Sequence, residues 1–117
     1  MSDNRQLFEL DPVVQGTTGD EVTIELKVNT VPVNLTSSTI KIAFVKYGSK
    51  KAIDELSVGN GITITNASGG IFKIDSRIYN WLTGVYFADA DITLSDGTKC
   101  NYLKLKLEIT ENKGKDA

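Results

Sequence analysis

The sequence predicts an all-β domain, an immunoglobulin-like antiparallel β-sandwich of about seven to eight strands. Residues 21–29 alternate cleanly between apolar and polar side chains, as expected of a half-buried strand. Turn signals rich in glycine recur about every 8–12 residues, a spacing typical of sandwiches. Only one short segment has helical character. Together these observations indicate many short strands around one core.

The composition is that of an ordinary globular domain. The chain has 117 residues, of which 40% are hydrophobic and 24% charged, and its net charge is −2. We expect no nucleic-acid or membrane partner, because phosphate binding needs a basic face and no apolar run approaches the about 20 residues of a membrane span. The N-terminus lacks the pattern of a signal peptide, so we expect synthesis in a cytoplasm.

Three parts are expected along the chain: an N-terminal arm at residues 1–15, the β-sandwich domain at residues 16–110, and a frayed C-terminal tail at residues 111–117. Leu7, Phe8 and Leu10 make the arm apolar and extended, and Pro12 ends that segment. Large apolar side chains are costly to leave in water, so the arm should dock. It could dock near Phe87 of its own subunit or on the open edge of a neighbouring subunit, and we favour the second.

Further strands are expected wherever alternating or apolar runs lie between turn residues. They are residues 21–29, 39–47, 52–58, 62–65 and 71–75, followed by a hairpin over 84–110. In the strand 39–47, Ala43 and Val45 lie opposite the face of Phe44, which indicates cover on both sides. Ser76 is expected to cap a single helical turn over 77–82. Trp81 in this turn should be a partly buried plug.

The hairpin is the most strongly specified element. Asp96-Gly97 predicts a two-residue type I′ loop, which fixes the register of the two strands. In this register apolar residues meet apolar residues, and carboxylates meet ammonium groups. A slip of one residue would destroy both kinds of pairing. The predicted pairs are Tyr86 with Leu107, Ala88 with Leu105, Ala90 with Leu103, and Asp89 with Lys104.

Little catalytic chemistry is available to this chain. It contains no histidine, and Cys100 is its only cysteine, so neither a Ser-His-Asp triad nor a cysteine zinc site can be built. Asp89 and Asp91 share one strand face and could hold calcium or act as a glycosidase pair, but we favour a solvated face paired with lysines. We therefore expect no catalytic residues, no metal ligands and no cofactor.

Exposed aromatic residues offer the best candidates for binding. Phe87 and Tyr102 lie on the outer face of the predicted hairpin. They form either a platform for a partner or a glycan, or a second buried layer beneath the arm or a loop. With the apolar residues of the arm, the candidate interface comprises Leu7, Phe8, Leu10, Phe87 and Tyr102.

Three segments, residues 19–46, 62–75 and 81–99, carry a family resemblance. They contain Val33-Asn34-Leu35-Thr36 in a connection, Leu82, Gly84 and Tyr86 where the hairpin begins, and Ser95-Asp96-Gly97 at its turn. This pattern resembles the N-terminal domain of the upper baseplate proteins of tailed bacteriophages and related short phage structural proteins. The resemblance covers about residues 16–110 and implies a β-sandwich that docks onto other virion subunits, with no catalytic residues to transfer.

The leading hypothesis is therefore a non-enzymatic structural protein of a phage or prophage particle. The resemblance implies that it is made in the host cytoplasm and located in the virion, where it contacts other baseplate or tail subunits and has the option of forming a homo-oligomer. The alternative is a carbohydrate-binding or adhesin-type immunoglobulin-like module that uses Phe87, Tyr102 and nearby carboxylates. An enzyme is the least favoured class.

Overall fold

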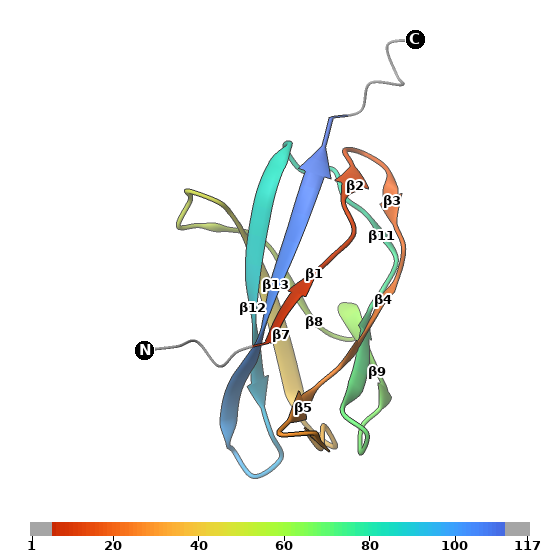
Figure 1. Ribbon diagram of the computed structural model, residues 1–117, viewed down its shortest axis with the longest axis vertical. Helices are drawn as coiled ribbons and strands as arrows, with labels where there is room; N and C mark the ends of the chain where they lie inside the picture. Colours follow the sequence, from red (N-terminus) through yellow and green to blue (C-terminus); the bar gives the residue numbers. More distant parts are fainter. Residues whose placement is uncertain (1–5, 112–117) are drawn as a thin grey trace.

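The computed structural model describes residues 6–111, except for the side chains of Gln6 and Tyr102, and this part of the chain consists of strands and connections without a helix (Figure 1). The strands are β1 (Gln6–Glu9), β2 (Val13–Val14), β3 (Thr18–Gly19), β4 (Val22–Glu25), β5 (Lys27–Val28), β6 (Val31–Pro32), β7 (Thr39–Lys46), β8 (Ala52–Val58), β9 (Gly61–Asn66), β10 (Ile71–Ile74), β11 (Arg77–Ile78), β12 (Gly84–Thr93) and β13 (Lys99–Thr110). The predicted all-β class is confirmed.

Most of these strands belong to one mixed sheet. Its order is β1-β13-β12-β7-β8-β9-β10-β4, and β2 also pairs with β13; β3 pairs with β11 and β5 with β6 in two small sheets. The predicted antiparallel arrangement holds only in part, because β1 and β2 run parallel to β13, and β8 runs parallel to β9. No short hairpin joins β1 to β13, so their direction of pairing is not constrained by a turn.

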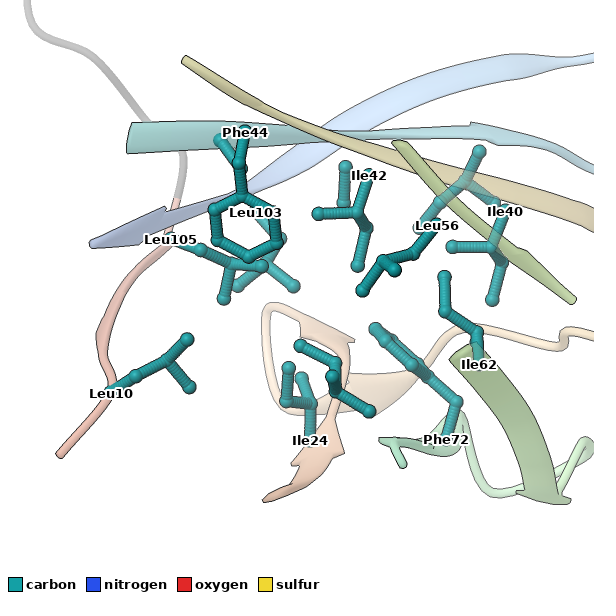
Figure 2. Close-up of a cluster of buried hydrophobic side chains, with 14 of the residues drawn as sticks. Leu10, Ile24, Ile40, Ile42, Phe44, Leu56, Ile62, Phe72, Leu103 and Leu105 are labelled. Carbon is teal, nitrogen blue, oxygen red and sulfur yellow. The ribbon is translucent and has the colours of Figure 1, made fainter. Parts of the chain in front are cut away.

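The sheet curls over so that its two halves face each other across a single core (Figure 2). Side chains from β7 and β13 point toward side chains from β4, β9 and β10. The core residues Ile24, Ile40, Ile42, Phe44, Leu56, Ile62, Phe72, Leu103 and Leu105 are all 0 or 1% exposed. Each such side chain contributes about 1.5–3 kcal/mol on burial, so this contact is the main source of stability.

The predicted hairpin register is confirmed over its longest part. Tyr86, Ala88, Asp89 and Ala90 pair with the predicted residues of β13. The predicted two-residue loop is wrong. Residues 95–97 form a three-residue loop instead. Leu94 N donates to Thr98 O at 2.8 Å across the loop, and Gly97 N, within the loop, donates to Leu94 O at 2.9 Å. Gly97 has a φ of 90°, as the last residue of such loops requires.

A bulge reconciles the longer loop with the predicted register. Ala90 pairs with Leu103 but Ile92 pairs with Cys100, so β13 places one residue more than β12 between these pairs. The extra residue of β13 cancels the extra residue of the loop. The side-chain amide of Asn101 donates to Asp91 Oδ1 at 3.2 Å beside the bulge. The loop and the bulge together therefore place the predicted residues opposite each other.

The predicted helical turn over 77–82 is also wrong. Arg77 and Ile78 form β11 and pair with β3, and Tyr79 N donates to Thr17 O. The Ser76 hydroxyl donates to Gly19 O, so tertiary partners take the cap hydroxyl and the backbone groups that a helical turn would use. The Arg77 side chain also pairs with Asp54. The prediction of a partly buried Trp81 is confirmed, since its ring lies 5.0–5.2 Å from those of Phe44, Tyr79 and Tyr86.

The segment predicted as an arm packs on its own subunit. β1 and β2 belong to the main sheet, so residue 15 marks no boundary within it. Leu10 is 8% exposed and Phe8 is half-buried against the core. The arm therefore lies along β13 rather than over Phe87. Residues 1–5 of the predicted arm, and 112–117 of the predicted tail, lie outside the described residues.

The core position of Leu105 gives a direct test of the hairpin. Leu105 is 0% exposed and pairs with Ala88 on one side and Phe8 on the other. Leu105→Ala should lower the free energy of unfolding by about 2–5 kcal/mol, because a cavity remains where the side chain was removed. Urea denaturation measures this loss, and a loss below about 1 kcal/mol would contradict the core position of Leu105.

The buried phenol groups of Tyr79 and Tyr86 should make the folded state less stable at alkaline pH. Burial raises the pKa of Tyr79 and of Tyr86 above the ordinary 10.0. The folded state then holds the two phenol protons more tightly than the unfolded chain does. Their contribution to the free energy of unfolding is therefore complete below about pH 10 and is lost as the pH rises through the raised pKa values. Urea denaturation at increasing pH should show this fall.

The double variant Tyr79→Phe/Tyr86→Phe is the control for this effect. A hydrogen bond to Glu21 raises the pKa of Lys73 above 10.5. The contribution of Lys73 to stability is therefore also lost as the pH rises, and it is lost equally in the parent and in the double variant. The double variant should therefore lose stability less steeply with pH than the parent. Equal slopes would show that the two phenols do not control alkaline stability.

Candidate interaction surface

The outer face of the main sheet carries a cluster of apolar and aromatic side chains. Because side chains alternate along a strand, the neighbours of core residues on β7 and β12 point away from the core. We call this cluster the outer patch, and it comprises Ala43, Val45, Tyr47, Val85 and Phe87. Phe87 pairs with Val45 across the strands, and Tyr47 N donates to Val85 O, so the members are direct neighbours.

The aromatic rings at the centre of the outer patch are close and tilted. The ring centroids of Tyr47 and Phe87 are 6.0 Å apart, with 58° between the ring planes. Lys104 places its ammonium 5.2 Å from the centroid of Phe87. Tyr47 is 76% exposed and Phe87 is partly exposed. The result is an open hollow with an apolar floor and one cation at its side.

Charged residues border this hollow. Asp89 and Asp91 line it together with Lys104, and Asp89 lies directly opposite Lys104 in the sheet. Asp91 accepts the hydrogen bond from Asn101. Within residues 6–111, no group of three or more histidine, cysteine, aspartate or glutamate side chains lies close enough together to hold a metal ion. The charged groups of Asp89, Asp91 and Lys104 thus form a polar border around the apolar side chains of the outer patch.

The structure separates the predicted interface residues. Leu7 is 53% exposed and pairs with Lys104, so it lies on the same outer face as Phe87. Phe8 and Leu10 alternate with it and turn toward the core. The backbone of Tyr102 lies in β13, and its side chain is outside the description. Leu7 and Phe87 are thus the predicted residues that the structure places on one surface.

Tyr47 was missed by the sequence analysis. It follows β7 at a position that shares the face of Ala43 and Val45, and that parity is the signal that could have identified it. Val45 and Ala43 are half-buried rather than fully covered, so the expected cover on both faces of β7 is incomplete among the described residues. Exposed Tyr47 extends the surface beyond Phe87.

No described segment forms a helix long and apolar enough to cross a membrane. A scan against family models gives no match to this sequence, and a search of curated proteins gives none either.

Exposure predicts a sharp contrast between two tyrosines. Tyr47→Ala should change the free energy of unfolding by less than about 1.5 kcal/mol, the contribution of an exposed aromatic pair. Tyr86 is 1% exposed, and Tyr86→Ala should cost about 3–5 kcal/mol. Urea denaturation of both variants measures the difference, and a similar loss in the two would mean that Tyr47 is part of the packed structure.

Proposed function

We propose that this chain is a non-enzymatic structural module of a tailed-phage or prophage particle that binds other baseplate or tail subunits through the outer patch. The observation that carries the proposal is the ring contact of exposed Tyr47 with partly exposed Phe87 on the outer side of the sheet. The family resemblance of the three sequence segments supplies the virion context. The module would be made in the host cytoplasm and located in the virion.

The chemistry of the outer patch favours a protein partner. Interface cores are enriched in aromatic residues and surrounded by polar rims, and a few large side chains contribute most of the binding energy. Here Tyr47 and Phe87 supply the large side chains, and Asp89, Asp91 and Lys104 supply the rim. Phe87, Asp89 and Asp91 lie on β12 and Lys104 lies on β13, and both strands are paired on both sides. Tyr47 follows β7 in a turn, where its N–H donates to Val85 O. Little backbone ordering is therefore needed on binding.

We also propose an immunoglobulin-like sandwich as the fold of this module. The arrangement of β7, β12 and β13 opposite β4, β9 and β10 supports it (Figure 1). The parallel pairs are confined to the first two strands and to the short crossing between β8 and β9. Gly59 and Gly61, with φ values of 87° and 95°, allow the chain to turn sharply at this crossing.

A carbohydrate-binding module is the second candidate, and one observation favours it. The hollow of the outer patch combines two aromatic rings with the carboxylates of Asp89 and Asp91. Rings can stack on the apolar face of a sugar while carboxylates accept its hydroxyl hydrogens. The 58° between the ring planes allows only one ring to lie flat against a given sugar, which is why we prefer a protein partner.

Co-expression with the proteins encoded beside this chain tests the proposal. We expect a complex with a tail or baseplate protein, detected by size-exclusion chromatography with light scattering. The double variant Tyr47→Ser/Phe87→Ser should abolish it. Val31→Ser is the matched control, because Val31 is 63% exposed but lies on β6. A complex that survives the double variant, or glycan-array binding that the double variant abolishes with no protein complex formed, would overturn the proposal.

A further inference from the structure

A second recess lies between the two halves of the curled sheet. Its walls are residues 10–14 and residues 17–22, and Tyr79 and Leu107 close its base. We call it the edge groove; its volume is about 280 Å³, just under the range of about 300–1,000 Å³ typical of small-molecule pockets. Its apolar floor comes from residues that face the core, so it is separate from the outer patch.

The walls of the edge groove stay apart because they pair with different strands. β2 pairs with β13, whereas β3 pairs with β11. Gln15 N donates to Thr110 O and Gly16 N donates to Tyr79 O, so the turn between the walls is tied to both sides. The two walls therefore do not pair as a hairpin, and a recess with buried Tyr79 and Leu107 at its base remains open.

The edge groove lies beside unpaired sheet edges. β1 and β4 are the two ends of the strand order. Leu26 N donates to Gly70 O, so Ile24 and Val22 use their backbone groups toward β10, and those of Thr23 point away from it. Among residues 6–111, no strand pairs with this side of β4. An unpaired edge of this kind is a template for an added strand.

Of the two edges, β4 is the better template. Pro12 follows β1 in the opposite wall and has no backbone N–H to donate, so pairing cannot continue along that wall. The wall of residues 17–22 leads directly into β4, which contains no proline. A strand added at β4 would thus run past the mouth of the edge groove.

Charge indicates the chemistry of that strand. Asp11 stands on one wall, Asp20 and Glu21 on the other, and all three are exposed. Glu21 pairs with Lys73 at 2.8 Å, and no ion pair is formed by Asp11 or Asp20 within the described part of the chain. The apolar floor and the acidic rim of the edge groove are together complementary to a segment in which apolar residues alternate with lysine or arginine.

We propose that the edge groove binds an extended basic β-strand of a partner subunit, which pairs with β4 and packs an apolar side chain near Tyr79. This is β-strand addition, in which main-chain hydrogen bonds supply affinity and side-chain recesses supply selectivity. The inference does not depend on the outer patch. It gives the module a second contact surface, so one subunit could join two neighbours.

A peptide titration followed by NMR tests this proposal on the full chain. The probe is a short capped peptide in which lysine alternates with valine, and its matched partner carries glutamate in place of lysine. We expect the lysine peptide to shift the amide signals of residues 19–23 and Tyr79, with an affinity that falls as salt is raised. The glutamate peptide should leave these signals unchanged.

Variants distinguish the edge groove from the rest of the surface. Asp11→Asn/Asp20→Asn should weaken binding about tenfold, as expected on losing two exposed ion pairs. Glu55→Gln, an exposed carboxylate on β8, should leave the affinity unchanged. Thr23→Pro removes a backbone donor at the free edge of β4 and should abolish binding, while the dispersion of the amide signals still shows a folded protein.

The asparagine double variant keeps the test decisive if Thr23→Pro fails to fold. The proposal would be overturned by no shift with the lysine peptide, equal binding of the glutamate peptide, shifts confined to the outer patch, or an unchanged affinity in Asp11→Asn/Asp20→Asn. Self-association of the free chain that Thr23→Pro removes would also overturn it, because the occupant would then be a second copy.

Discussion

The pairing of β12 with β13 is the interaction on which the rest of the structure depends. This ladder is the longest among the described residues, and it fixes the face on which each side chain of the two strands lies. β7 extends it on one side, while β1 and β2 extend it on the other. Because one register determines both faces, it buries Leu103, Leu105 and Leu107 and at the same time presents Phe87 beside Lys104. The core and the outer patch are therefore two results of one alignment.

This alignment was predicted by counting back from a two-residue loop and agreed with alternation, but the chain reaches it in a different way. The pairs from Tyr86 to Ala90 follow from matching apolar and charged positions, whereas the loop length was predicted from a dipeptide. The bulge in β13 restores the register that the three-residue loop would shift, since side-chain burial along the whole ladder outweighs the preference of one turn. Local rules failed again at 77–82, where β3 pairs with the backbone groups that a helical turn would use.

The candidate surfaces were only partly predictable for a similar reason. The parity of β12 placed Phe87 outside, and the same reasoning applied to β7 would have added Tyr47. The sequence could not show that β1 lies parallel along β13, because no turn links the two strands, and this pairing decides that Phe8 faces inward while Leu7 faces outward. The edge groove forms where residues 10–22 lie against Tyr79 and Leu107, and no local pattern shows that these distant segments meet.

The parallel alignment of β1 with β13 has a mechanical consequence. A pull applied at Gln6 and at Thr110 would drag the two strands in opposite directions along their length, because both run the same way. The hydrogen bonds between β13 and the first two strands would then bear the load together, in shear, instead of opening one after another. Under such tension the lifetime of the domain is set by its forced unfolding rate, so a few backbone bonds at one sheet edge would govern its resistance to force.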